Sequence, residues 1–325
     1  MADHAEDDVN DDGDIFVYRG GHVPLHITHV LIDKSVNEIE DNAFNSCQDL
    51  LTVDTHDGIR RVGWCAFQYC RSLRRINLKS VVEFYSFAFN GCFNLESVEF
   101  GDSVESIANS AFRCTSLSHL KLPSIITIGS GAFCYCKRLT HVEFSDRLQR
   151  IEARAFDHCE RLQRIAIPLK RNLFAFDNRR HEYAQFDECE QLTTVCLVGE
   201  AHTLTVASLH MESWRVEMND SINRINEILP NTPANEKTGE IRQWMETVLD
   251  KMDHYKAEHH RHVKEGTILL ELALWKAKLG EKEDNSVEEK PQKAKVDAQS
   301  ARKGKRITCG ADTVIKNVLP FLQLE

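Results

Sequence analysis

The chain has 325 residues, of which 42% are hydrophobic and 28% are charged. This content supports one large or two medium domains with real cores, and it excludes a wholly disordered chain. No apolar run approaches the ~20 residues that a bilayer-spanning helix needs, so the sequence also excludes a transmembrane protein.

Residues 1–14 form an acidic arm that carries most of the net charge of −10. The arm contains seven acidic residues and no Lys or Arg, so it repels itself and is expected to be disordered. It lacks the apolar stretch of a secretory signal peptide, which predicts a cytoplasmic protein. The charge elsewhere is close to balanced and does not demand nucleic acid or an anionic membrane as a partner.

A repeated pattern occupies residues 15–200. The dipeptide Ala-Phe recurs six times in register with a following Cys, and a seventh copy has Gln185 in place of the Ala. A Cys follows each copy at intervals of 22 or 23 residues, with a last interval of 30, and a Leu lies three residues after each Cys. The six alanines are Ala43, Ala66, Ala88, Ala111, Ala132 and Ala155. The seven cysteines are Cys47, Cys70, Cys92, Cys114, Cys136, Cys159 and Cys189.

Each repeat continues into a short apolar alternation that is typical of a β-strand, as at Ile76 and Leu78 or at Val142 and Phe144. A coil of this size cannot bury its own apolar face, so neighbouring coils stack and share one core. In the segment that returns from one strand to the next, the small Ala side chain lets neighbouring coils approach closely. The Phe side chain fills the space between the coils. We therefore predict an α+β protein, with a solenoid of short parallel strands in 22–23-residue coils followed by a small α-helical module.

The unit resembles the BspA-type leucine-rich repeat over about residues 25–198, because Ala-Phe, Cys, Leu and the strand keep one register through seven copies. Pro123 and Pro168 also occupy the position after the strand where that family has Pro. The resemblance implies a solenoid that binds other molecules or takes part in adhesion, with neither catalysis nor a cofactor. Residues 201–325 resemble the helical C-terminal extension of some unsecreted members from single-celled eukaryotes.

The seven repeat cysteines are expected to form a ladder of buried, reduced thiols with one thiol in each coil. Four further cysteines lie outside this ladder, and the sequence has no Cys-x-x-Cys pair, so it does not favour a zinc site. The four are Cys65, Cys134, Cys196 and Cys309.

The polar residues that flank each inward strand position are expected to line the concave surface of the solenoid. They place His119 beside His141, and Glu99 beside Lys121 beside Glu143. This surface is either a charge ladder that keeps the sheet soluble or a strip that contacts a partner. Two histidines alone are too few ligands for a metal site. The residues predicted to bind a partner are Arg75, Asn77, Glu99, His119, Lys121, His141, Glu143 and Arg164.

An insertion of seven or eight residues lengthens the last coil within residues 168–181. Its basic and aromatic residues are Lys170, Arg171, Phe174, Phe176, Arg179, Arg180 and His181. Basic residues interleaved with aromatic ones can bind nucleic acid or an acidic peptide. The favoured interpretation is an ordinary coil lengthened by an insertion whose two phenylalanines pack inward, since the domain as a whole is not basic.

The C-terminal region changes to a helical period. Residues 201–280 have apolar side chains three and four apart and predict a helical hairpin, with a bend at Gly266 in the second helix. Residues 281–306 are predicted to be a charged linker, and residues 307–325 a short helix that docks on the hairpin. The alternative is that these helices self-associate as a coiled coil.

Two charged clusters in this region suggest more specific functions, a metal site and a nuclear import signal, and neither is the favoured interpretation. His254, Glu258 and His262 share one helix face, so a metal is conceivable, but a solvated polar face is the preferred interpretation. The basic cluster at residues 302–306 is either a nuclear import signal or a solvated run, which leaves a nuclear location as an alternative.

The sequence contains no nucleotide-binding loop and no nucleophile elbow, which argues against an enzyme. We predict a non-catalytic scaffold or recognition module that binds a protein through the solenoid face, with self-association through the C-terminal helices as a further option. The alternatives are a surface adhesion protein exported by an unrecognised route and a nucleic-acid-associated protein. The partner is not named by the sequence, because surface detail varies freely under one fold.

Overall fold

The computed structural model describes residues 15–21, 23–177, 184–199 and 212–284, with side chains up to residue 276. The chain divides into two compact units, Met1–Lys251 and Met252–Glu325, which are described separately. The predicted acidic arm, most of the predicted linker and the predicted C-terminal helix at 307–325 lie outside the described residues.

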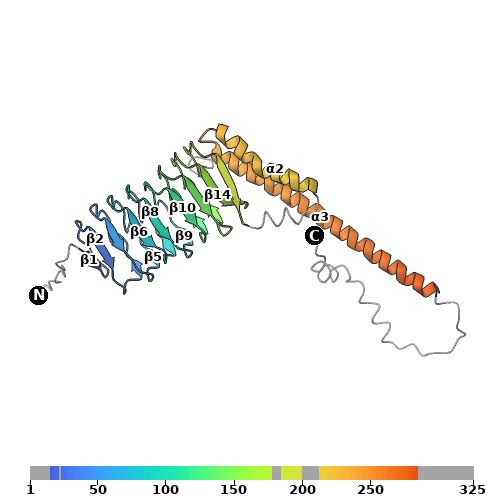
Figure 1. The fold of residues 1–325 in the computed structure, drawn as a ribbon, viewed down its shortest axis with the longest axis horizontal. Coiled ribbons are helices and arrows are strands. Elements are labelled where there is room, and N and C mark those ends of the chain that lie inside the picture. Colours follow the sequence, from blue (N-terminus) through green and yellow to red (C-terminus); the bar gives the residue numbers. More distant parts are fainter. Residues whose placement is uncertain (1–14, 22, 178–183, 200–211, 285–325) are drawn as a thin grey trace, which may run out of the picture. The chain divides into compact units, whose positions relative to one another are not determined.

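The first unit is a solenoid in which each coil carries a long strand and most coils also carry a two-residue strand (Figure 1). Every strand pair is parallel, which confirms the solenoid predicted from the repeat. The long strands are β1 (Ile15–Tyr18), β2 (His29–Ile32), β4 (Thr52–Asp54), β6 (Arg75–Leu78), β8 (Ser97–Phe100), β10 (His119–Leu122), β12 (His141–Phe144), β14 (Arg164–Pro168) and β15 (Thr194–Val198). The short strands are β3 (Glu38–Ile39), β5 (Arg61–Val62), β7 (Glu83–Phe84), β9 (Ser106–Ile107), β11 (Thr127–Ile128) and β13 (Arg150–Ile151).

A continuous stack of phenylalanine rings forms the centre of the solenoid, with one ring from each Ala-Phe copy. Adjacent rings lie 4.9 Å apart at Phe44 and Phe67, and 5.7 Å apart at Phe156 and Phe186. All seven rings are fully buried, and Tyr18 extends the stack at the N-terminal end with its ring 4.9 Å from that of Phe44. Stacked, buried aromatic rings of this kind contribute both apolar burial and ring–ring attraction.

The repeat cysteines form the predicted ladder of buried thiols beside the ring stack. Five of the thiols donate a hydrogen bond to the phenylalanine carbonyl of the preceding coil, as from Cys92 to Phe67 at 2.9 Å and from Cys159 to Phe133 at 3.2 Å. Cys47, in the first of these coils, donates to Pro24 O at 3.8 Å instead. The ten cysteines in the described part of the chain are all free thiols. Burial raises the pKa of Cys136 to about 12, so this thiol stays protonated.

Cys114 does not belong to the ladder, and its assignment from the sequence is wrong. It lies three residues after Ala111, whereas every other repeat Cys lies four residues after its Ala or Gln185. The ladder position is taken by Thr115, which is buried and has its Oγ1 3.2 Å from the Cys136 thiol. Cys114 is half-buried in a left-handed backbone conformation with φ of 59°.

The long strands form two sheets instead of one, while the short strands form a single continuous sheet. β1, β2, β4, β6 and β8 belong to the first long-strand sheet, and β10, β12, β14 and β15 to the second. Among the described strands, β8 and β10 are neighbours along the solenoid that share no ladder hydrogen bonds. The six short strands run from β3 to β13 without such a break.

The break lies at a coil that is one residue short. Ala111 and Leu117 are six residues apart, whereas the equivalent pair Ala88 and Leu95 is seven apart. In the longer coils a turn closes before the strand, with the N–H of Leu95 donating to Cys92 O at 3.0 Å. Residues 115–118, all of which the structure describes, form no such turn. The chain therefore enters β10 without this turn, and β10 forms no ladder with β8.

Two helices follow the solenoid and close its C-terminal end. They are α2 (Glu212–Ile228) and α3 (Lys237–Asp284), joined through the short 3-10 helix η1 (Leu229–Asn231). The indole Nε1 of Trp244 donates to Ser221 O at 2.6 Å, and Lys251 lies 2.9 Å from Glu217. These contacts make α2 and the beginning of α3 an antiparallel hairpin.

Polar side chains of this hairpin satisfy the backbone of the last coil. The amide of Asn226 both accepts from the N–H of Val195 at 2.7 Å and donates to Val195 O at 3.1 Å, as a neighbouring strand would. The buried ammonium of Lys237 donates to the carbonyls of Glu190 and Leu192, each at 2.7 Å. The helices therefore cap the solenoid, as terminal units of repeat proteins must do.

The second unit is described up to residue 284 and contains the remainder of α3. The helix continues through Gly266, where the sequence predicts a bend. Open space surrounds this glycine, and a single glycine costs a helix only about 1 kcal/mol. Among the described residues, no helix is long and apolar enough to cross a membrane.

Candidate functional site

The break between β8 and β10 opens a groove on the long-strand face. The groove is open to solvent, has a volume of about 470 Å³ and lies where the two long-strand sheets meet. Its lining residues are Lys79, Val98, Glu99, Phe100, His119, Leu120, Lys121, His141 and Glu143. Five of them are partner-binding residues predicted from the sequence, namely Glu99, His119, Lys121, His141 and Glu143.

Apolar side chains of β8 form the floor of this groove. Val98 and Phe100 are half-buried, whereas the equivalent Ile76 and Leu78 of β6 are buried. The Phe100 ring is held in place by the Phe112 ring, which it meets edge to face at 5.4 Å. The floor is therefore apolar and packed against the core, and part of its surface stays in contact with solvent.

The rim of the groove carries two ion pairs. Lys79 lies 2.9 Å from Glu99, and Lys121 lies 3.6 Å from Glu143. The predicted row of Glu99, Lys121 and Glu143 is thus replaced by separate pairs on the two sides of the break. All four side chains are more than half exposed, so these pairs add little to stability and instead shape the charge of the surface.

His119 and His141 occupy the second sheet beside the groove, side by side as predicted. Their rings stack 5.2 Å apart and nearly parallel. Each Nδ1 lies within hydrogen-bond distance of the hydroxyl of the preceding residue, 3.0 Å to Ser118 and 2.9 Å to Thr140. Among the described residues, no group of three or more His, Cys, Asp or Glu side chains could hold a metal ion.

The other predicted residues lie on the same face outside the groove. Arg75 and Asn77 are exposed on β6, and Arg164 is exposed on β14, where it pairs in register with His141. Lys79 was not predicted, because it follows the strand instead of flanking an inward position. Val98 and Phe100 were missed because their spacing is that of core residues.

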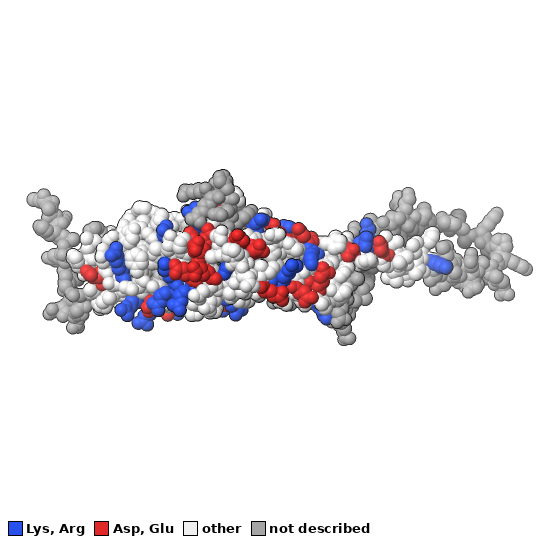
Figure 2. All heavy atoms as spheres, turned by 90° about the horizontal axis from the view of Figure 1, so that it is seen from above, with Lys and Arg blue, Asp and Glu red and all other residues white. Residues whose placement is uncertain are grey.

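Acidic and basic side chains are mixed over the described surface seen in Figure 2. The face in view does not carry one sign of charge throughout.

The match to a known family lies over the same repeat. The family described as BspA type leucine-rich repeat region matches with six copies over residues 24–127 and 116–227, which is more than half of the chain. The chain belongs to this family. BspA-type leucine-rich repeat proteins generally take part in protein interaction or surface adhesion and are non-enzymatic repeat proteins. No curated protein matches the chain.

Several solved leucine-rich repeat structures are similar to this BspA-type protein. One from Bacteroides ovatus has 22% identity and a TM-score of 0.43, and the match covers 55% of this chain and 48% of that protein. The T. pallidum protein TpLRR has 20% identity and a TM-score of 0.38, with 63% and 92% covered. The pneumococcal vaccine antigen PcpA has 19% identity and a TM-score of 0.37, with 52% and 50% covered. The chain thus spans about half the length of the Bacteroides protein.

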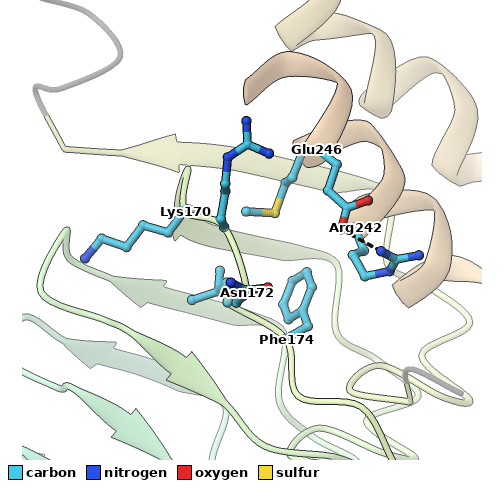
Figure 3. A pocket seen from close by; sticks show the side chains of 8 residues that line it. Lys170, Asn172, Phe174, Arg242 and Glu246 are labelled. Carbon is cyan, nitrogen blue, oxygen red and sulfur yellow. Dashed lines mark hydrogen bonds and ion pairs between the residues drawn. The ribbon is translucent and has the colours of Figure 1, made fainter. Parts of the chain in front are cut away.

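The insertion of this BspA-type protein contacts the beginning of α3 (Figure 3). Arg171 lies 2.8 Å from Asp250, and the ammonium of Lys170 donates to Asp146 O. A small hollow of about 20 Å³ remains between the two segments. Its lining residues are Lys170, Arg171, Asn172, Leu173, Phe174, Arg242, Met245 and Glu246. The hollow holds about one water molecule, so it is packing space and not a ligand site.

The two phenylalanines of the insertion behave differently. Phe174 is buried and meets the Phe186 ring edge to face at 5.7 Å, as predicted. Phe176 is 43% exposed, so the prediction that both rings pack inward is wrong for this residue. Arg179, Arg180 and His181 lie outside the described residues.

The histidine-rich part of α3 forms ion pairs along the helix. His254 lies 3.8 Å from Glu258, and His262 lies 3.9 Å from Glu265. These are i,i+4 and i,i+3 neighbours on an exposed helix, where such pairs contribute a few tenths of a kcal/mol.

The turns that carry the Ala-Phe segments form the side of the solenoid opposite the long strands, here called the arc side. One group of residues on the arc side superficially resembles a thiol active site. The carboxylate of Asp157 lies 3.8 Å from the Cys134 thiol and 2.6 Å from Nδ1 of His158. Asp157 therefore lies between the thiol and the imidazole, so the imidazole cannot act as a base for the thiol. Burial and the Asp157 carboxylate raise the pKa of Cys134 to about 12, the opposite of activation.

Proposed function

We propose that this BspA-type protein is a non-catalytic recognition module that binds a partner protein through its long-strand face. The groove between β8 and β10 receives an apolar side chain of the partner. The observation that supports the proposal is the half-buried floor of Val98 and Phe100, at the one described position where the two long-strand sheets separate.

The groove has the make-up of a protein-binding hot spot. An apolar floor supplies area that a partner can bury, and a charged rim of Lys79, Glu99, Lys121 and Glu143 supplies orientation. The floor is held on paired strands and by the buried ring of Phe112, so little conformational entropy is lost when a partner binds.

A charge exchange at the rim tests this proposal. Lys121→Glu combined with Glu143→Lys keeps an ion pair in place but reverses the charge at one wall of the groove. Lys137→Glu combined with Glu160→Lys is a matched control, because this pair is 2.6 Å apart in the turns that precede β12 and β14 and joins two neighbouring coils outside the groove. Both double variants are expected to unfold at the same temperature as the native chain.

The readout is quantitative affinity capture from the native cell lysate, followed by direct binding measurements on the captured protein. We expect one protein to be retained by the native chain and by the control, and to bind at least tenfold more weakly to the groove variant. Equal retention by all three chains would place the binding surface elsewhere. A native chain that retains no protein would overturn the recognition role itself.

A further inference from the structure

The distal part of α3 exposes an unusual amount of apolar surface. Six large apolar side chains within eight residues are between 44% and 67% exposed. They are Ile268, Leu269, Leu270, Leu272, Leu274 and Trp275. A contiguous exposed cluster of this kind on a soluble helix marks an interaction surface.

The cluster surrounds the helix. Ile268, Leu272 and Trp275 share one face at steps of four and three residues, while Leu270 and Leu274 lie on another face. A helix that is apolar on more than one side is normally buried. In the first unit, the apolar residues of the same helix are in fact buried, with Ile241 and Val248 both fully inaccessible to solvent. The distal part is therefore the section of α3 that still requires a cover.

We propose that residues 311–324 of the same chain cover this apolar part of α3. The segment carries Val314, Ile315, Val318, Leu319 and Leu322, spaced one and three residues apart, so it has a matching apolar stripe. Residues 285–310 cannot serve, because that stretch is dominated by charged and small side chains.

The tether between the two surfaces has a suitable length. Residues 285–310 comprise 26 residues, and a flexible chain of that length spans roughly 25–30 Å on average. The distance along the helix from Asp284 back to Leu272 is about 18 Å at ~1.5 Å per residue. A tether that matches its span gives an effective concentration in the millimolar range, which favours the chain's own segment over a second copy at micromolar concentration.

Trp275 provides a direct optical readout of the proposed contact, because it is 64% exposed on the uncovered helix. Its emission is isolated as the difference between the full chain and the Trp275→Phe variant. We expect this difference spectrum to be blue-shifted, as for a buried indole. The substitution Val318→Asp, made in both backgrounds, is expected to shift it to the red by several nanometres. Asn317→Asp is the matched control, since it adds the same charge beside the stripe and is expected to leave the spectrum unchanged.

Sedimentation analysis of the same samples identifies what covers the helix. A monomer whose Trp275 emission responds to Val318→Asp supports the proposal. Identical Trp275 spectra in the Val318→Asp and Asn317→Asp chains would overturn it, and so would a blue shift that appears only with dimer formation at rising concentration. The melting temperature of the solenoid is expected to be the same in all these chains, which separates this test from that of the groove.

Discussion

The two sides of the solenoid respond differently to one short coil. On the arc side, the Phe89 and Phe112 rings remain stacked 5.1 Å apart, and the short-strand sheet continues past this coil. On the opposite side, the long-strand sheet breaks between β8 and β10. At the coil that lacks one residue, only the long-strand side is therefore interrupted.

The difference reflects what each side would lose. Separation on the arc side would break the ring stack and expose buried thiols, and each large buried side chain is worth roughly 1.5–3 kcal/mol. Separation on the long-strand side removes a few exposed ladder hydrogen bonds, each worth ~0.5–1.5 kcal/mol net. The weaker side therefore opens, and the opening creates the groove that we propose as the binding site.

The largest expected effect comes from truncating the arc-side stack. Phe112→Ala removes a fully buried ring and is expected to lower the free energy of unfolding by about 3–5 kcal/mol. Phe100→Ala, on the long-strand side, removes a half-buried ring and should cost clearly less. Urea denaturation of the two variants measures both values. Equal losses would mean that the two sides are equally important for stability.

Alkaline pH should weaken the arc side next. Burial raises the pKa of Cys47 to about 11 and that of Cys136 to about 12, whereas thiols of the unfolded chain titrate near 8.5. Above about pH 8.5 the unfolded chain therefore binds fewer protons than the folded chain, and stability falls as pH rises. The slope approaches about 1.4 kcal/mol per pH unit for each such thiol.

Denaturation curves between pH 7 and 10.5 measure this slope. Cys136→Ser or Cys136→Ala should flatten it by the contribution of one thiol. A free energy of unfolding that stays constant up to pH 10 would show that the ladder thiols are not protected from ionisation.

The smallest effect on stability, but the sharpest on function, is expected from restoring the missing residue. An Asn inserted between Ser116 and Leu117 gives this coil the length of its neighbour, which has Asn94 at that position. We expect β8 and β10 to pair and the groove to close. The free energy of unfolding should change by less than about 1 kcal/mol, while partner binding falls at least tenfold.

Hydrogen exchange at the backbone amides of β8 and β10 reports the new ladder directly. Ser116→Asn, which adds the same side chain without changing the length, is the control and should leave exchange unchanged. If the insertion left amide exchange as fast as in the native chain, the short coil would not be the cause of the break.

The repeat and most of its structural consequences can be predicted from the amino-acid sequence. The period, the buried phenylalanines and the family could all be predicted, because each coil packs against equivalent neighbours and therefore needs the same residue types at the same positions. The row of polar side chains on the long-strand face could also be predicted, since strand alternation places His119, Lys121 and Glu143 on one face.

The tertiary structure alone decided where the regularity fails. The spacing from Ala111 already shows that Thr115, and not Cys114, takes the ladder position. The spacing does not show whether the long strands or the short strands lose their pairing at this coil. The contacts of Asn226 and Lys237 with the last coil likewise join residues more than 30 positions apart. Local patterns predict such coils well, whereas the ends and the defects of the stack depend on long-range packing that no local pattern contains.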